Sequence, residues 1–140
     1  MRIEKINSEN IKEIKRFIRR IPGISEINEE ILNRVLILRN DFEIKAIISY
    51  ECFSNKGLIR YFIFHKDVDF EELEMLVEEM IKNTKEESIN LVLTVIDDES
   101  LVPFFEKLGF HKCLIENVYI GEVSLENTLY HNAIGLVKES

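Results

Sequence analysis

Residues 102–110 read Val-Pro-Phe-Phe-Glu-Lys-Leu-Gly-Phe, and this stretch decides the fold that we predict for the chain. It predicts a short helix over residues 101–108 that stops at Gly109, because glycine suits the left-handed conformation in which many helices end. A nearly continuous apolar run comes just before it, at residues 89–96, as is typical of a strand buried on both faces. A buried strand is therefore expected to lead into a short helix.

The rest of the chain alternates between extended and helical patterns. Apolar residues recur at helical spacing over residues 11–21 and 70–81, and Ser25 offers an N-cap for a further helix that includes Ile31 and Leu32. Strands are predicted at residues 2–6, 35–38, 42–53, 58–64, 110–119 and 130–137. This order predicts an α/β (α+β) fold, with a mixed, mostly antiparallel sheet of six to seven strands and about four helices on its faces.

The composition limits the function classes that suit this chain. Its 140 residues are 46% hydrophobic, which is enough for a single domain with a sizeable core. The formal net charge of -8 argues against nucleic acid or an anionic membrane as the main partner. A charged N-terminus, with no apolar stretch near the roughly 18 residues that a membrane span needs, predicts a cytoplasmic protein. Cys52 and Cys113 form no Cys-x-x-Cys pair, so we expect two buried thiols and no metal site.

The stretch at residues 102–110 resembles the late signature of the GNAT superfamily of acyl-CoA-dependent N-acetyltransferases, in which an aromatic pair precedes Glu-Lys-Leu-Gly-Phe. Two later stretches, Ile-Glu-Asn-Val-Tyr at 115–119 and Asn-Ala-Ile-Gly-Leu-Val at 132–137, resemble the closing strands of ribosomal-protein-type members. The earlier elements also follow the order of that superfamily. The resemblance implies a single GNAT-like domain over residues 1–140.

The resemblance also implies where acetyl-CoA would bind. In this superfamily the backbone of the fourth strand pairs with the pantetheine arm, and a Gly-rich turn opens the next helix, whose N–H groups hold the diphosphate. The corresponding strand here ends in Phe62, Ile63 and Phe64, which we take, together with Phe105, as candidate cofactor contacts. The turn that follows, residues 64–73, contains no glycine.

Acidic side chains stand where that diphosphate turn would be. Asp69 and Glu72 have the spacing of a capping box, and Asp67 and Glu71 add charge to the same helix end. A carboxylate about 8 Å from a phosphate charge costs roughly 2 kcal/mol at an effective dielectric near 20. The sequence therefore predicts a degenerate site at which binding of acetyl-CoA is possible but doubtful.

Residues that could carry the chemistry are few. Phe105 occupies the place of the tyrosine that many members use as a general acid, and phenylalanine has no proton to donate. Ribosomal-protein-type members use a tyrosine in the following strand, for which Tyr119 is the candidate. His65 at the end of the fourth strand, or Glu51 on the third, would accept a proton from an amine. Each of these two also suits an ordinary position at a strand end or on an exposed sheet face.

A basic stripe follows the first predicted helix of this acidic chain. Its members recur at i, i+3, i+4, i+7 and i+8, opposite the apolar face, and they are Lys12, Lys15, Arg16, Arg19 and Arg20. A solvated helix face explains the stripe, and an acidic protein partner is its best functional interpretation.

Two functions from different classes follow from these observations. The first is a GNAT-like domain with a degenerate acyl-CoA site, catalytically weak or silent, that binds a protein or a small ligand. The alternative is an active acyl-CoA-dependent N-acetyltransferase acting on a primary amine, with His65 or Glu51 accepting the proton and Tyr119 protonating the sulfur. The sequence does not indicate the acceptor, the partner or the oligomeric state.

Overall fold

The computed structural model describes residues 1–21, 28–113, 119–120, 123–124 and 134–139. The helices in this part of the chain are α1 (Ile11–Arg19), α2 (Glu29–Leu32), α3 (Phe70–Glu86) and α4 (Val102–Lys107), with a short 3-10 helix at Glu99–Leu101. The strands are β1 (Arg2–Lys5), β2 (Leu36–Arg39), β3 (Ile44–Phe53), β4 (Lys56–Phe64), β5 (Leu91–Ile96), β6 (His111–Cys113), β7 (Tyr119–Ile120), β8 (Val123–Ser124) and β9 (Ile134–Glu139).

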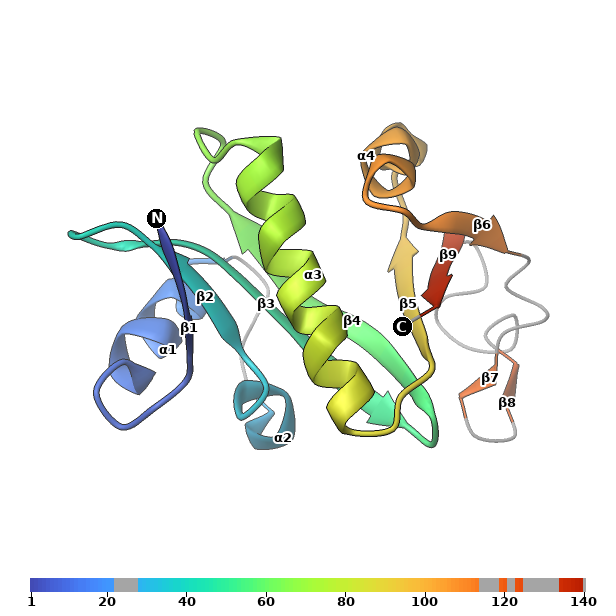
Figure 1. The fold of residues 1–140 in the computed structure, drawn as a ribbon, viewed down its shortest axis with the longest axis horizontal. Coiled ribbons are helices and arrows are strands. Elements are labelled where there is room, and N and C mark those ends of the chain that lie inside the picture. The colour runs from blue at the N-terminus through green and yellow to red at the C-terminus, as the bar shows by residue number, and fades with distance from the viewer. Residues whose placement is uncertain (22–27, 114–118, 121–122, 125–133, 140) are drawn as a thin grey trace. The chain divides into compact units, whose positions relative to one another are not determined.

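Seven of these strands form one sheet in the order β1-β2-β3-β4-β5-β9-β6 (Figure 1). β4 and β5 run parallel, whereas β1, β2 and β3 are joined by antiparallel ladders, as are β5, β9 and β6. The predicted fold class, a mostly antiparallel mixed sheet with four helices, is confirmed for the described residues.

The chain divides into two compact units, one formed by Met1–Glu51 with Arg60–Met80 and the other by Cys52–Ile59 with Ile81–Ser140. Each unit is described by itself below. The prediction of a single domain over residues 1–140 stays a prediction. No helix among the described residues is long and apolar enough to cross a membrane.

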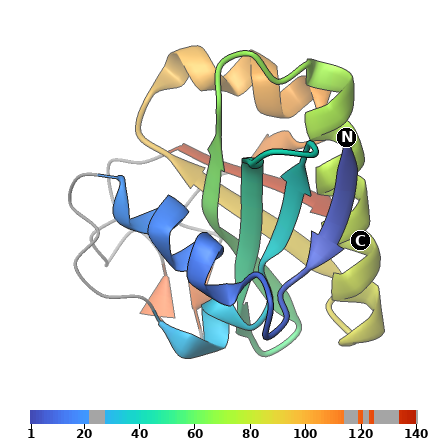
Figure 2. The same ribbon diagram turned by 90° about the vertical axis from the view of Figure 1, so that its left-hand side faces the viewer.

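In the first unit, α1 and α2 cover one face of β2 and β3. Ile37 of β2 pairs with Ile47 of β3, and both are fully buried in a cluster with residues of the two helices. The helix residues of this cluster are Ile14, Phe17, Ile18 and Leu32. Figure 2 shows α1 on one side of these strands and the first part of α3 on the other. Alternate residues of both strands are therefore buried against helices on both faces.

Asparagine side chains position the two helices of this unit. The Asn7 carboxamide oxygen accepts hydrogen bonds from the N–H groups of Glu9 and Asn10 just before α1. The Asn28 oxygen does the same for Glu30 and Ile31 at the start of α2. Asn28 is therefore the N-cap of α2. The predicted cap Ser25 lies outside the described residues.

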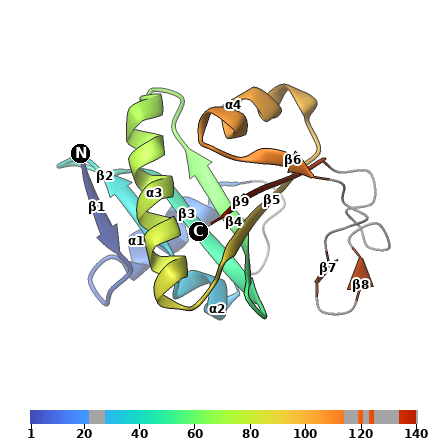
Figure 3. The same cartoon turned by 45° about the vertical axis from the view of Figure 1, so that its right-hand side comes forward.

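In the second unit, β5 is the central strand. It pairs along its whole length with β9 and, at its start, in parallel with β4, where Leu58 lies opposite Leu93. These two leucines are buried and form a small cluster with Val137 and other partly buried apolar residues. Figure 3 shows β6 next to β9, after α4. A continuous apolar sequence such as 91–96 suits this position between two strands.

The decisive Glu-Lys-Leu-Gly-Phe run forms a complete helix-ending motif. Gly109 has φ +96°, and its N–H donates to the Glu106 carbonyl at 3.0 Å, while the Phe110 N–H donates to the Phe105 carbonyl at 3.0 Å. These are the two bonds of a Schellman motif. The rings of Phe105 and Phe110 meet edge to face at 5.7 Å, which adds the apolar contact that often accompanies it. The predicted helix end at Gly109 is confirmed.

The prediction of two long closing strands is only partly right. β6 covers three residues at the start of the range 110–119, and Tyr119 lies in β7, which pairs with β8 in a separate two-stranded sheet. Residues 114–118 and 130–133 lie outside the described part. β9 begins at Ile134 and continues to Glu139. The difference arises because Tyr119 finds its backbone partner in Ser124, a short-range pairing that an apolar pattern does not reveal.

Candidate functional site

The candidate site in the first unit centres on the end of β4 and the turn that precedes α3. Tyr61 has φ +54°, which is rare for a residue with a side chain and interrupts the regular strand geometry one residue before Phe62. The turn itself is closed by backbone bonds. The His65 N–H donates to the Lys45 carbonyl at 2.9 Å, and the Val68 N–H donates to the His65 carbonyl at 3.1 Å. These bonds fix the path of the backbone between β4 and α3.

An ion pair ties this turn to β3. Lys45 Nζ donates to an oxygen of Asp67 at 2.9 Å and lies 3.6 Å from Glu43. The Lys45 side chain is only 9% exposed, so its charge needs a partner at the surface. The hydrogen bond with Asp67 raises the pKa of Lys45, and the same bond lowers the pKa of Asp67. Both groups are therefore held in their charged forms.

We expect Asp67→Asn to lower stability near neutral pH and to lose this effect at both ends of the pH range. A lowered carboxyl pKa contributes stability above the ordinary aspartate pKa, and this contribution disappears as the pH falls below about 4. A raised lysine pKa contributes stability that disappears as the pH rises above about 10. Urea unfolding of both proteins across this range measures the difference. Asp97→Asn, at an exposed carboxylate outside the pair, is the control, and an equal pH dependence there would contradict the assignment.

The start of α3 differs from the prediction. Glu72 and Leu73 donate their N–H groups to the Asp69 carbonyl at 3.1 Å, but neither the Asp69 nor the Glu72 carboxylate forms a hydrogen bond with another described residue. The predicted capping box is therefore not formed. Asp69 and Glu71 are exposed and Glu72 is half-buried, so three carboxylates at this helix end lack a cationic partner in the described structure. Asp67, in contrast, is directed to Lys45.

The candidate base Glu51 is held by an arginine. Arg60 of β4 donates to the Glu51 carboxylate of β3 at 2.8 Å, and its guanidinium group lies 5.9 Å from the centre of the Tyr61 ring. The Glu51 side chain is 22% exposed. The Glu51 carboxylate is therefore engaged in a charge-assisted hydrogen bond between the two strands.

The candidate base His65 contacts α1. Its ring stacks on that of Phe17 with the ring centres 5.8 Å apart and the planes 17° from parallel. The residue is half-buried, at the edge of the cluster that contains Phe17. An aromatic contact that holds the ring in place is what an ordinary packed histidine shows, and it leaves the ring partly accessible.

The three candidate cofactor contacts at the end of β4 divide between two faces. Ile63 packs with the apolar cluster beneath α1, whereas the rings of Phe62 and Phe64 lie 5.2 Å apart. Phe64 is 39% exposed. Successive side chains of a strand point to opposite faces, so Phe62 and Phe64 present an aromatic pair on the side away from α1.

The remaining candidates lie in the second unit. Phe105 is 6% exposed and contacts Phe104 and Phe110 edge to face, so packing of the helix end accounts for it. Tyr119 pairs with Ser124 through the backbone of β7, and its side chain lies outside the described part of the structure. Whether any of the site candidates takes part in binding or catalysis stays a prediction.

The two cysteines are half-buried and form no disulfide with a described residue, so the prediction of two buried thiols is only partly right. Cys113 packs at the edge of the Leu58 and Leu93 cluster, and this burial raises the pKa of its thiol. A raised pKa keeps the thiol protonated and less reactive. In the part of the chain that the structure describes, no group of three or more His, Cys, Asp or Glu side chains could hold a metal ion.

Comparison with known proteins identifies the fold. No protein-family profile matches the sequence, and no curated protein matches it either. Solved structures do match. N-acetylglutamate synthase from Neisseria gonorrhoeae, complexed with coenzyme A and L-arginine, superposes with a TM-score of 0.75 at 17% identity over 99% of this chain. This chain spans only 32% of that protein's length.

Two further matches are close to this chain in size. Rv2747 from Mycobacterium tuberculosis, in complex with CoA and NLQ, has a TM-score of 0.75 at 10% identity. The match covers 100% of this chain and 99% of the Rv2747 chain. The ribosomal-protein-S18-alanine N-acetyltransferase from Escherichia coli has a TM-score of 0.65 at 13% identity, over 99% of this chain and 92% of its own. The chain therefore has the GNAT acetyltransferase fold, and the predicted resemblance is confirmed at the level of the fold.

Sequence reasoning missed the two ion pairs of the site. The Lys45–Asp67 and Arg60–Glu51 pairs join residues 22 and 9 positions apart. A basic residue within an otherwise apolar strand was the available signal for Lys45, because a buried lysine needs a carboxylate close by.

Proposed function

We propose that this chain is a GNAT-fold binding domain whose acyl-CoA site is too weak to support acetyl transfer. One observation carries the proposal: three carboxylates without a cationic partner, those of Asp69, Glu71 and Glu72, surround the start of α3. The N-terminal end of a helix attracts anions through its N–H groups and partial positive charge. Negative side chains at that end oppose the approach of a diphosphate by direct repulsion.

The turn has an exposed cation, Lys66, against these three carboxylates, and the neighbouring cation Lys45 is held by the protein. Lys45 is bonded to Asp67 and lies near Glu43, so its charge is balanced by the protein itself. The turn has no glycine that would let its backbone approach a phosphate group closely. These residues do not fit a coenzyme diphosphate, and we assign no catalytic step to the site. The cytoplasmic location stays a prediction from the sequence.

The alternative is an active N-acetyltransferase acting on a primary amine. The structures of N-acetylglutamate synthase and Rv2747 with coenzyme A favour it, because both share the fold of this chain. The contacts that the two candidate bases already make weigh against an active enzyme. Glu51 is bonded to Arg60, and the His65 ring is stacked on Phe17.

We expect acetyl-CoA to leave the melting temperature unchanged. A ligand present at about 100 times its Kd stabilises a folded protein by roughly 2.7 kcal/mol, which shifts the midpoint by several degrees in a chain of this size. Differential scanning fluorimetry with increasing acetyl-CoA, up to about 1 mM, tests for such a shift. A concentration-dependent rise, matched by binding in isothermal titration calorimetry, would overturn the proposal and favour the enzyme.

A further inference from the structure

One face of α1 carries cations that the protein does not balance. We call Lys12, Lys15, Arg16, Arg19 and Arg20 the α1 basic face. All are exposed except Lys15, which is half-buried. None forms an ion pair with another described residue, although the chain has an excess of acidic groups. Arg16 and Arg19 lie in the last turn of α1, where a cation also interacts favourably with the helix dipole.

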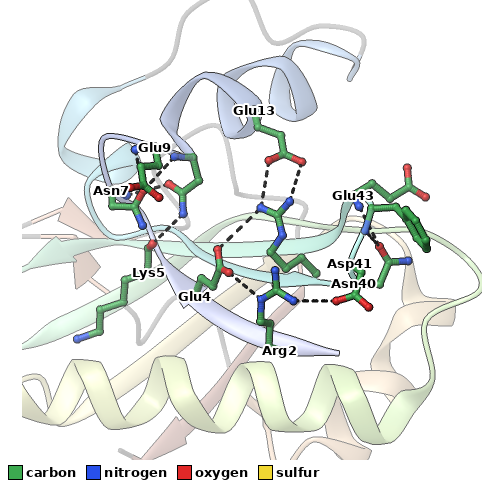
Figure 4. Close-up of polar contacts among 12 residues, drawn as sticks. Arg2, Glu4, Lys5, Asn7, Glu9, Glu13, Asn40, Asp41 and Glu43 are labelled. Atoms are coloured by element: carbon green, nitrogen blue, oxygen red, sulfur yellow. Dashed lines mark hydrogen bonds and ion pairs between the residues drawn. The ribbon is translucent and has the colours of Figure 1, made fainter.

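The acidic residues beside the α1 basic face are occupied by other cations. Both carboxylate oxygens of Glu13 accept hydrogen bonds from Arg39 of β2, at 3.1 and 3.4 Å (Figure 4). Glu43 lies 3.6 Å from Lys45. Lys45 also bonds Asp67 and the Glu43 side chain is 51% exposed, so Glu13 is the better neutralised of the two. The five cations of the α1 basic face outnumber these two carboxylates, and the net charge of this surface is therefore positive.

An exposed aromatic ring lies next to these cations. Phe42, in the turn between β2 and β3, is 91% exposed. The turn is closed by Asn40, whose side-chain oxygen accepts hydrogen bonds from the N–H groups of Phe42 and Glu43 at 2.9 and 2.8 Å (Figure 4). Phe42 thus remains in water because the backbone of a tight turn holds it there. A large apolar side chain held in solvent favours burial by a partner.

A hollow joins the two features. It has a volume of about 230 Å³ and is lined by Arg16, Phe17, Arg20, Phe42 and Ile44, together with the carboxylate residues Glu13 and Glu43. Arginine and aromatic residues are the types enriched at the centres of protein interfaces. The hollow is large enough for a side chain and has cations at its edge.

We propose that the α1 basic face and Phe42 form a docking surface for an acidic protein segment that inserts an apolar side chain beside Phe42. This inference deepens the proposed function and rests on it, because it names the partner class of the binding domain. The acidic residues of the segment would pair with the cations of the α1 basic face, and its apolar side chain would bury Phe42. Nucleic acid and anionic membranes are less suitable, because the rest of a chain with net charge -8 repels them.

The test uses the full chain and a fluorescein-labelled peptide of repeated Glu-Glu-Leu-Glu sequence, followed by fluorescence anisotropy. We expect saturable binding that weakens with salt, and a loss of at least tenfold in affinity for the double variant Arg16→Glu, Arg20→Glu. The matched control is Lys82→Glu, Lys85→Glu, which makes the same charge change at exposed positions of α3 and should bind within twofold of the original chain. Circular dichroism confirms that each variant is folded.

Phe42→Ala separates the apolar contribution from the electrostatic one. It should weaken binding of the Glu-Glu-Leu-Glu peptide severalfold and leave binding of an all-glutamate peptide unchanged, since only the first peptide has an apolar side chain to bury. An equal effect on both peptides would contradict the proposed insertion beside Phe42.

The remaining outcomes also decide the question. Equal losses in the two double variants would overturn the proposal, since overall charge would then explain binding. Tighter binding of single-stranded oligonucleotides or phosphatidylserine vesicles would overturn it in favour of those partners. Self-association that Arg16→Glu, Arg20→Glu abolishes, without peptide binding, would assign the surface to a second copy of the chain. Acetyl-CoA titration of the same samples keeps the two proposals apart: a thermal shift together with peptide binding would refute only the proposed function.

Discussion

Replacing Asp69, Glu71 and Glu72 with their amides should raise the affinity for acetyl-CoA at least tenfold. Each carboxylate about 8 Å from a phosphate charge costs roughly 2 kcal/mol at an effective dielectric near 20, before screening by salt. These side chains are exposed or half-buried, so we expect only part of this repulsion to be realised. Even so, about 1.4 kcal/mol in total is a factor of ten in Kd. Isothermal titration calorimetry at low salt measures the change. Asp67 is left in place because it balances Lys45.

The control for this experiment lies further along the same helix. Glu78→Gln, Glu79→Gln, Glu86→Gln removes the same number of charges from α3, but each position is more than one turn further from the helix start than Glu72. We expect little gain in affinity from it. A similar gain in both triple variants would show that net charge, and not the helix start, limits binding. An unchanged affinity in the first variant would contradict the electrostatic argument for the proposed weak acyl-CoA site.

Phe17→Ala should lower the free energy of unfolding by about 3–5 kcal/mol, whereas Phe42→Ala should change it by less than about 0.5 kcal/mol. The two residues have the same side chain and opposite environments. Phe17 is 7% exposed in the cluster beneath α1 and stacks on His65, while Phe42 is 91% exposed. Chemical denaturation at neutral pH measures both. A small cost at Phe17 would contradict the packing of α1 on the sheet, and a large cost at Phe42 would contradict its exposure and with it the proposed docking surface.

The parts of the fold that local chemistry determines were predictable from the sequence. The end of α4 depends on Gly109, with Phe105 and Phe110 on either side, all within a few residues. The helical periods of α1 and α3 were predicted because one face of each helix is apolar. The pairing of β7 with β8 was not, since two-residue strands are too short to show an alternating pattern.

The candidate site was predictable in its composition and not in its contacts. The absence of glycine and the excess of carboxylates before α3 are visible in the sequence. The partner of each carboxylate is not visible there: Asp67, after β4, bonds Lys45 of β3, and the Asp69 carboxylate forms no helix cap. Pairs such as Arg60 and Glu51 depend on strand register, which is fixed only when the sheet forms.

The Schellman motif at the end of α4 has a consequence for how proteins of this fold are recognised. Its glycine turns the chain and its flanking aromatic rings close the helix, and neither task involves a coenzyme or an acceptor amine. The requirements of folding alone therefore account for these residues. A search built on this motif therefore detects the fold and does not by itself report the activity of a protein.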